Sequence, residues 1–398
     1  MQNRDSLDEW LRWQENLMEE TILLGLERVQ KVYQRLFPNG VPFFVVTVGG
    51  TNGKGSTISF IEGIYRDSEY KIGCSTSPHL IKYNERYAID GKIVDDATIV
   101  RAFEAIERKR EGISLTYFEF STLAALLIFA EASIDIAILE VGLGGRLDSV
   151  NVVDCDIAVI TNIDIDHTDY LGNTRESIGL EKAGIMRKNK SCFCADQDPP
   201  KSLLAYADEI GANLAFVREP YGGEIGLKGD HQKINAALAI KVVEQLNGQF
   251  PVSSEMIKAG ARKAQIAARF QQIESGNKTV ILDVAHNSAA VKTLVKMLEK
   301  NAMPTVAIFS ALADKDIDDM IRLASKTIMH WFLVPISSER ALQTDDLKNI
   351  FDSSQATTVC SDMKSAINQA LLHNNSSRVV IFGSFYTVTD AMVILQDN

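Results

Sequence analysis

A glycine-rich segment at residues 49–57 has the residue types that bind a nucleoside triphosphate. It consists of Gly-Gly-Thr-Asn-Gly-Lys-Gly-Ser-Thr and follows an apolar run at 43–48. Glycines let the backbone curl until several N–H groups face the phosphates, and the following helix adds its positive end. Lys54 supplies a mobile charge for the outer phosphates, and the Ser56 hydroxyl can reach Mg²⁺. A turn that only joins a strand to a helix is the alternative. The expected nucleotide contacts are Gly50, Thr51, Asn52, Gly53, Lys54, Gly55 and Ser56.

Polar residues also follow three other apolar runs, at 76–80, 140–146 and 164–169. Ligands of open parallel sheets bind outside the carboxyl ends of the strands, so we expect these segments to share one site with the glycine-rich segment. Glu140 ends an apolar run, where a carboxylate must be paired or must bind a metal. The two alternatives are a Mg²⁺ ligand and an ion pair with Arg146. A nicotinamide site at 142–147 is disfavoured, because Leu147 takes the place of the third glycine and residues 148–151 have the pattern of a loop, not of a helix start.

Short apolar runs alternate with helical patterns along the whole chain, which predicts parallel sheets covered on both faces. We therefore expect an α/β fold of two doubly wound domains, an N-terminal P-loop ATPase-type domain at 1–270 and a smaller Rossmann-like domain at 271–398. Strands are expected at 43–48, 72–76, 134–141, 157–162, 191–195, 279–284, 305–310, 331–334, 357–359 and 379–382. Helices are expected within 7–37 and near 56–67, 95–110, 117–132 and 175–187.

The composition of the 398 residues is that of a globular protein, with 46% hydrophobic and 23% charged residues. The formal net charge of -11 argues against a nucleic-acid partner. The five cysteines are scattered, which favours buried reduced thiols over a zinc site. The most apolar stretch is interrupted by Glu131 and Asp135, and the first residues are polar, so we expect no membrane span or signal peptide. A cytoplasmic monomer is the resulting expectation.

The glycine-rich segment differs from the common P-loop by an extra residue, Gly55, between Lys54 and Ser56. In this form it resembles the nucleotide loop of the Mur ligase superfamily and, within it, of the folylpolyglutamate synthase and dihydrofolate synthase family. Further similar blocks run along almost the whole chain. The resemblance implies an enzyme that uses ATP and Mg²⁺, with two Mg²⁺ sites expected and a monovalent cation left open.

The resemblance also implies roles for single residues. It implies Mg²⁺ ligation by Ser77, Glu140 and His167, and a carbamylated Lys182 that holds a second Mg²⁺. It implies ATP contacts from Asn235, Arg269 and Asp283, although Ala268 stands where the family block has glycine. Lys54, Lys182, His286 and Lys315 are the implied catalytic residues, and His286, Lys315 and Ser384 are implied to bind glutamate or steady an acyl phosphate.

Two further segments, at 21–28 and 115–119, resemble the walls of the family's pterin pocket. Aromatic rings suit a flat pteridine, and a carboxylate can accept its ring N–H groups. Ordinary helix packing by Tyr117 and Phe118 is the alternative, and Leu23 stands where some relatives have an acidic residue. The expected pocket residues are Ile22, Leu23, Leu24, Thr116, Tyr117, Phe118, Glu119, Leu147, Asp148 and Ser149.

These features together predict an ATP-dependent ligase that adds L-glutamate to dihydropteroate and to tetrahydrofolate through an acyl phosphate. Two alternatives stay open. A cell-wall Mur ligase shares the ATP chemistry, but such enzymes have an additional N-terminal domain, whereas the glycine-rich segment begins here at Gly49. A nucleotide switch would hydrolyse ATP without needing an amine acceptor.

Overall fold

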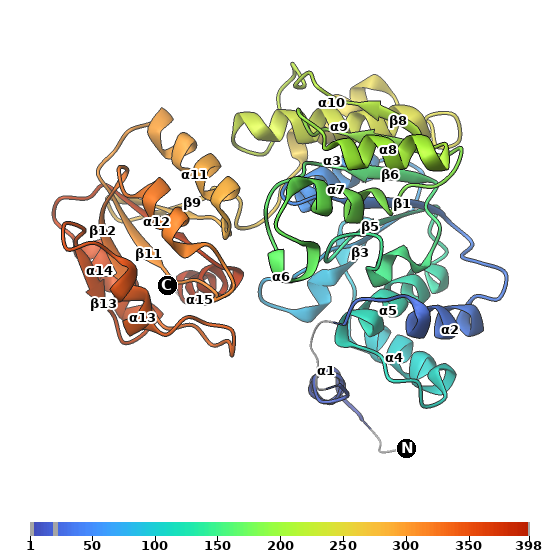
Figure 1. Cartoon of the computed structure of the whole chain (residues 1–398), viewed down its shortest axis with the longest axis horizontal. Coiled ribbons are helices and arrows are strands. Elements are labelled where there is room, and N and C mark those ends of the chain that lie inside the picture. Colours follow the sequence, from blue (N-terminus) through green and yellow to red (C-terminus); the bar gives the residue numbers. More distant parts are fainter. Residues whose placement is uncertain (1–3, 19–22, 397–398) are drawn as a thin grey trace. The chain divides into compact units, whose positions relative to one another are not determined.

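The computed structural model describes residues 4–18 and 23–396. The chain folds into two compact units, Met1–Gln265 and Ile266–Asn398, which are described separately (Figure 1). The sequence predicted the boundary five residues later, after residue 270 (270 − 265 = 5). Residues 266–270 thus belong to the compact unit that also contains the second sheet.

The first unit contains an eight-stranded sheet with the order β4-β3-β2-β5-β1-β6-β7-β8. The strands from β2 to β8 in this order are parallel, whereas β3 and β4 are antiparallel additions at one edge. The carboxyl ends of β2, β5, β1 and β6 therefore lie at the same edge. The strands are β1 (Phe44–Gly49), β2 (Ile72–Ser75), β3 (Tyr87–Ile89), β4 (Lys92–Ile93), β5 (Ile136–Glu140), β6 (Ile157–Ile160), β7 (Ser191–Cys194) and β8 (Asn213–Phe216).

Helices cover both faces of this sheet (Figure 1). Helices α3, α9 and α10 pack together on one side, and α4 packs against α5 on the other. The helices are α1 (Leu7–Glu15), α2 (Glu27–Leu36), α3 (Lys54–Tyr65), α4 (Asp96–Arg110), α5 (Tyr117–Glu131), α6 (Thr168–Leu171), α7 (Arg175–Ala183), α8 (Lys201–Ile210), α9 (Asp230–Leu246) and α10 (Ser254–Lys263). Within 4–18 and 23–396, no helix has the length and apolar character that crossing a membrane requires.

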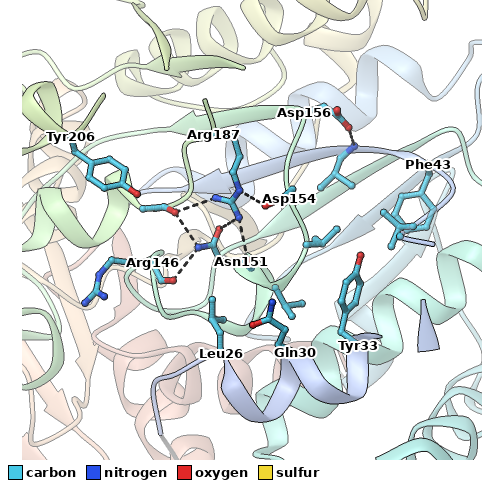
Figure 2. Close-up of a pocket in the computed structure, with 16 residues that line it drawn as sticks. Leu26, Gln30, Tyr33, Phe43, Arg146, Asn151, Asp154, Asp156, Arg187 and Tyr206 are labelled. Carbon is cyan, nitrogen blue, oxygen red and sulfur yellow. Dashed lines mark hydrogen bonds and ion pairs between the residues drawn. The ribbon is translucent and has the colours of Figure 1, made fainter. Parts of the chain in front are cut away.

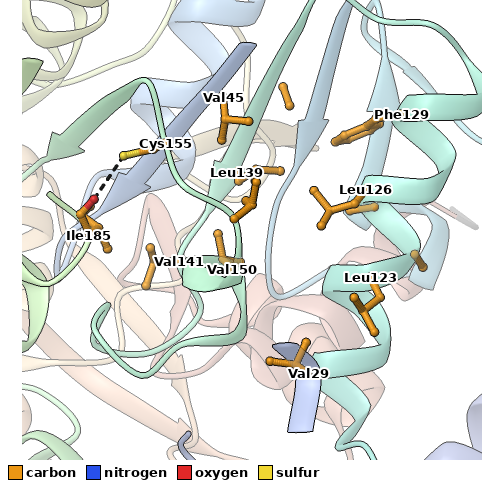
Figure 3. Packing of buried hydrophobic residues seen from close by; sticks show 14 of the residues in the cluster. Val29, Val45, Leu123, Leu126, Phe129, Leu139, Val141, Val150, Cys155 and Ile185 are labelled. Carbon is orange, nitrogen blue, oxygen red and sulfur yellow. Dashed lines mark hydrogen bonds between the residues drawn. The ribbon is translucent and has the colours of Figure 1, made fainter. Parts of the chain in front are cut away.

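Helix α5 is the centre of the core in the first unit. Its sequence is apolar nearly all round, which is typical of a buried helix. Leu123, Leu126 and Phe129 of this helix are fully buried and belong to the same cluster as Leu139 of β5 (Figure 3). This packing places the start of α5 next to the loop that leaves β5.

The second unit contains a six-stranded sheet with the order β13-β12-β11-β14-β10-β9, in which only β9 is antiparallel. Its core includes Phe309, Trp331 and Phe382. The predicted α/β fold with two mainly parallel sheets is confirmed. The elements are β9 (Gln271–Ser275), β10 (Lys278–Leu282), α11 (Ser288–Lys300), β11 (Thr305–Phe309), α12 (Ile317–Ala324), β12 (Ile328–Leu333), α13 (Thr344–Ile350), β13 (Thr357–Val359), α14 (Met363–Leu372), β14 (Arg378–Phe382) and α15 (Phe385–Gln396).

One local expectation was wrong. The segment 148–151 was expected to be a loop, but Ser149–Val152 forms a short 3₁₀ helix. The Asp148 side chain explains it, because its Oδ1 accepts a hydrogen bond of 2.9 Å from the backbone N–H of Val150 and caps the turn.

Candidate active site

The glycine-rich loop leaves β1 in a conformation that requires glycine at two positions. Gly50 has φ of +139° and Gly53 has φ of +89°, both in the region that other residues rarely adopt. A Cβ on Gly50 would lie 1.8 Å from Thr161 Oγ1, and one on Gly53 would lie 2.7 Å from Asn235 Oδ1. The loop therefore packs too closely on its neighbours to admit side chains. Asn235 of α9 lies directly against this loop at Gly53.

The segment after β6 holds this loop in place. The backbone N–H of Thr51 donates to Asn162 O at 2.9 Å, and that of Asn52 donates to Asn162 Oδ1 at 2.8 Å. Thr161 Oγ1 donates to Asn52 O at 2.6 Å. No role was predicted for Thr161 or Asn162 from the sequence. Their position directly after a predicted strand was the available signal.

Lys54 begins α3, and its side chain returns over the loop. Its Nζ donates to the carbonyl oxygens of Gly50 at 3.2 Å and Thr51 at 3.3 Å. Gly55 and Ser56 follow in the first turn of the same helix. A strong positive charge and the positive end of α3 thus coincide at the loop, which is the arrangement that polyphosphate binding requires.

Ser77 and Glu140 lie together at the same edge. The backbone N–H of Ser77 donates to Glu140 Oε2 at 3.0 Å, across the neighbouring strands β2 and β5. Glu140 is 7% exposed and pairs in register with Val48 of β1. Arg146, the alternative partner of Glu140, instead forms an ion pair of 2.7 Å with Glu181. The arrangement leaves the metal-binding interpretation of Glu140 standing.

His167 follows β6 and caps the short helix α6 in a left-handed conformation with φ of +52°. Its Nε2 lies 4.0 Å from Asp166 Oδ2. Among the described residues, no group of three or more histidine, cysteine, aspartate or glutamate side chains is placed to hold a metal. The oxygen donors of Glu140 and Ser77 fit Mg²⁺, which commonly binds one or two carboxylates and takes its other ligands from phosphates and water.

Lys182 of α7 is a buried lysine, 4% exposed. Burial, followed by the charge of Lys54, lowers the pKa of Lys182 to about 7, while Asp166 and Asp148 oppose the shift. At neutral pH a large fraction of the amine is therefore uncharged. An uncharged amine is the form that can add CO₂ to give a carbamate.

Asp148 organises the loop after β5. Its Oδ2 accepts from the backbone N–H of Leu143 at 2.7 Å, and its own N–H donates to Gly145 O at 3.1 Å. Burial raises the pKa of Asp148 to about 6, against the effect of its backbone hydrogen bonds. Asp148 was expected to line the pterin pocket. In the structure its side chain accepts hydrogen bonds that hold the loop after β5 in its conformation.

The three segments expected to line the pterin pocket meet one another. The backbone N–H of Gly25 donates to Leu147 O at 3.2 Å. Arg28 Nη2 donates to Glu119 Oε1 at 3.1 Å and, within its own segment, to Leu23 O at 3.0 Å. Thr122 of α5 and Ser149 share a hydrogen bond of 2.6 Å between their hydroxyls. Leu24 lies between Leu23 and Gly25 in the sequence. Ile22 falls outside the described residues.

The start of α5 contacts the loop after β5 directly. A Cβ on Gly142 would lie 2.6 Å from the Phe118 ring, so the ring lies against the bare backbone there. Glu119 forms a capping box with Thr116, accepting its backbone N–H at 2.7 Å, and also accepts from Arg28 at 3.1 Å. Both Glu119 oxygens are therefore already used within the protein. Tyr117 begins the helix.

Four of the five functional candidates of the second unit follow its strands, whereas Arg269 precedes β9. Asp283 follows β10, and its oxygens accept from the backbone N–H groups of Phe270 at 2.8 Å and Ala285 at 2.9 Å; burial raises the pKa of Asp283. His286 Nδ1 lies 2.8 Å from Val284 O. The Arg269 guanidinium lies 5.4 Å from the Phe385 ring centroid, and Lys315 Nζ lies 3.8 Å from Asp314 Oδ2. Ser384 caps α15, because its hydroxyl oxygen accepts from the backbone N–H of Thr387 at 3.0 Å.

A cavity of about 660 Å³ in the first unit contains none of these candidates. Phe43, Asp154 and Asp156 line it beside the amino ends of β1 and β6, the opposite end of those strands from the glycine-rich loop. Figure 2 shows Arg187 reaching across it to Asp154 and Asn151. Its polar groups are thus largely paired with one another, and the predicted chemistry lies elsewhere.

Comparisons with known proteins decide the family. The Mur ligase middle domain matches residues 48–213, and the Mur ligase glutamate ligase domain matches residues 268–385. The dihydrofolate synthase/folylpolyglutamate synthase of Escherichia coli (strain K12) is 37% identical over 98% of this chain and 95% of its own length. This chain belongs to the dihydrofolate synthase/folylpolyglutamate synthase family. The predicted membership and the enzyme class, an ATP-dependent ligase of the Mur ligase type, are confirmed.

Solved structures of the family agree with this assignment. E. coli FolC in complex with DHPP and ADP superimposes with a TM-score of 0.92 at 35% identity, covering 99% of this chain and 98% of that one. The bifunctional enzyme from Yersinia pestis, complexed with AMPPNP and a Mn ion, gives a TM-score of 0.89 at 37% identity, covering 98% of both chains. The Yersinia pestis enzyme thus binds an adenine nucleotide together with a divalent metal ion.

Proposed function

We propose that this chain joins L-glutamate to dihydropteroate, giving dihydrofolate, and to tetrahydrofolates, giving polyglutamates, with ATP as the energy source. One observation carries the proposal. Phe118, in the expected pterin wall, lies against Gly142, and Gly142 is two residues from Glu140, which contacts Ser77. The loop that leaves β5 therefore connects the expected pterin wall with the expected metal ligands. It lies at the same edge of the sheet as the glycine-rich loop.

The chemistry follows from the leaving group. A carboxylate does not react with an amine at neutral pH, because oxide is a poor leaving group; transfer of a phosphoryl group from ATP gives an acyl phosphate, which an amine can attack. Loss of phosphate then forms the amide. In this scheme the glycine-rich loop and Lys54 hold the phosphates in position, and positioning and charge stabilisation supply most of the catalysis.

Ser77 and Glu140 are proposed to hold Mg²⁺, with His167 as a third ligand. When bound, Mg²⁺ neutralises the phosphate oxygens that gain charge. We propose that Lys182 is carbamylated and holds a second cation, supported by its burial and by the lowering of its pKa to about 7. Three further assignments are predictions. The nucleotide is expected to be bound by Asn235, Arg269 and Asp283. Glutamate or the acyl phosphate is expected to contact His286, Lys315 and Ser384. The protein is expected to be a cytoplasmic monomer.

The test is ATP-dependent incorporation of labelled L-glutamate by the purified protein. Dihydropteroate, tetrahydrofolate and a muramyl precursor are compared as acceptors. We expect incorporation with the two pteroyl acceptors and none with the muramyl precursor. Incorporation with the muramyl precursor alone would favour a cell-wall ligase, and phosphate release that needs neither acceptor nor glutamate would favour a nucleotide switch.

A further inference from the structure

Arg86 is a buried cation that the assignments above leave unused. It ends the 3₁₀ helix Tyr83–Arg86 and is 8% exposed. Its Nε donates to His79 Nδ1 at 2.9 Å. Within residues 4–18 and 23–396, its guanidinium makes no other hydrogen bond and no ion pair with a carboxylate. Because arginine has five N–H donors, four of them are left without an acceptor of this kind.

Two tyrosine rings flank the same guanidinium. Its carbon lies 5.3 Å from the ring centroid of Tyr83 and 5.5 Å from that of Tyr117. Cation–π contacts of this kind compensate part of the lost hydration, but they use the faces of rings and satisfy no N–H group. An arginine that is 8% exposed has lost most of its hydration, so an anion that supplies acceptors for the remaining N–H groups stabilises it. The geometry is that of a site prepared for an anion.

The position of Arg86 indicates which anion it receives. Its backbone carbonyl accepts from the N–H of Thr76 at 3.1 Å, next to Ser77, the expected metal ligand. On its other side, Tyr117 precedes Phe118, whose ring lies against Gly142. Arg86 thus lies between the segment that contacts Glu140 and the expected pterin wall. Phosphates already have the glycine-rich loop and Lys54, whereas no cation has yet been assigned to the acceptor's carboxylate.

We propose that Arg86, oriented by His79 and flanked by Tyr83 and Tyr117, binds a carboxylate of the pteroyl acceptor. The planar guanidinium matches a carboxylate with two parallel N–H···O bonds, which a lysine ammonium cannot reproduce. The inference rests on the proposed function, because it concerns the acceptor of that reaction. Dihydropteroate offers only its reacting carboxylate, while tetrahydrofolate also offers one that does not react.

The experiment measures KM for each substrate in Arg86→Gln and Arg86→Lys. Arg101→Gln is the matched control, since Arg101 is exposed and pairs with Glu131 on the surface. We expect Arg86→Gln to raise the acceptor KM by about 10- to 100-fold, the loss typical of a charge-assisted hydrogen-bonded pair. Arg86→Lys should show a smaller increase, and the KM values for ATP and glutamate should stay within about 2-fold of wild type in both.

An increase with both acceptors supports binding of the reacting carboxylate, and an increase confined to tetrahydrofolate supports binding of the second one. An unchanged acceptor KM, or an increase confined to ATP or glutamate, would overturn the inference. Thermal unfolding of each variant checks folding, and Arg86→Lys carries the test if Arg86→Gln does not fold. If the wild-type protein uses neither acceptor, the proposed function fails; if it uses them and Arg86→Gln matches it, only this inference fails.

Discussion

The backbone N–H of Ser77 donates a 3.0 Å hydrogen bond to Oε2 of Glu140, a residue 63 positions later in the chain. The parallel pairing of β2 with β5 brings the two together, because both residues lie at the carboxyl ends of these strands. The contact orients a buried carboxylate beside the glycine-rich loop.

Glu140→Gln should keep the fold and lose activity. The glutamine carbonyl oxygen still accepts from Ser77, but the charge that attracts a divalent cation is removed. We expect kcat to fall on the order of 100-fold or more, since metal stabilisation of the transition state is worth several kcal/mol. The Mg²⁺ concentration for half-maximal activity should rise. Glu131→Gln, on the exposed end of α5, is the control; equal losses in both variants would refute a metal-binding role for Glu140.

Lys54→Ala should abolish ATP turnover with the fold intact. In the described chain the Lys54 ammonium donates its hydrogen bonds to the loop carbonyls of Gly50 at 3.2 Å and Thr51 at 3.3 Å, so its removal leaves two uncharged acceptors and no broken ion pair. ATP-dependent phosphate release and far-ultraviolet circular dichroism measure the two properties. Near-normal turnover would count strongly against the nucleotide-binding assignment of this loop.

Lys182→Met should stabilise the protein most at and below neutral pH. Burial lowers the folded-state pKa of Lys182 from 10.5 to about 7, so the unfolded chain binds more protons between these two values. The contribution of Lys182 to the free energy of unfolding therefore rises with pH across that window. The cost of burying charged Lys182 in the folded state is largest below about pH 7. The difference in thermal midpoint between Lys182→Met and the wild type should decrease as pH rises toward about 10.

The measurement needs CO₂-free buffer, because a carbamate would turn Lys182 into an anion. Lys241→Met serves as the control, since Lys241 is half exposed and pairs with Glu244 on the surface of α9. A gain in thermal midpoint that is constant across the pH range would contradict the lowered pKa of Lys182.

Ala268→Gly should stabilise the second unit. Ala268 has φ of +57°, a left-handed conformation that costs a residue with a Cβ roughly 1–2 kcal/mol. Glycine avoids this cost but loses more entropy on folding, so we expect a net gain of about 0.5–1 kcal/mol in the free energy of unfolding. Fluorescence of Trp331, with Trp10 and Trp13 replaced by phenylalanine, follows this unit by itself. Ala290→Gly, within α11, should instead destabilise it.

The sequence predicted the parallel strands well, because buried parallel strands are continuous apolar runs. It missed the antiparallel edges. The turn between β3 and β4 is Asp90-Gly91, with φ of +49° and +72°, and Asp-Gly is a strong hairpin signal that was present in the sequence. The β9–β10 hairpin turns similarly at Gly276, with φ of +60°.

The site was predictable only where residue types announce chemistry. Glycines, Lys54 and Glu140 stand out at strand ends, so their convergence followed from the rule for open sheets. Arg86 could not be singled out from the sequence. What distinguishes it is its low exposure of 8% and its N–H groups without acceptors in the described chain, and both properties are visible only in the fold. Likewise, Glu119 could not be identified as a capping residue from its type alone, since the same carboxylate would suit a pterin.

The central claim, activation of an acid by transient phosphorylation, is tested most directly by isotope transfer. Dihydropteroate labelled with ¹⁸O in its carboxylate is incubated with the protein, ATP, Mg²⁺ and L-glutamate, and the released phosphate is analysed by mass spectrometry. An acyl phosphate requires that one labelled oxygen of the carboxylate leaves with the phosphate. We predict one ¹⁸O atom in each phosphate formed; phosphate free of the label, released while the amide forms, would contradict the account.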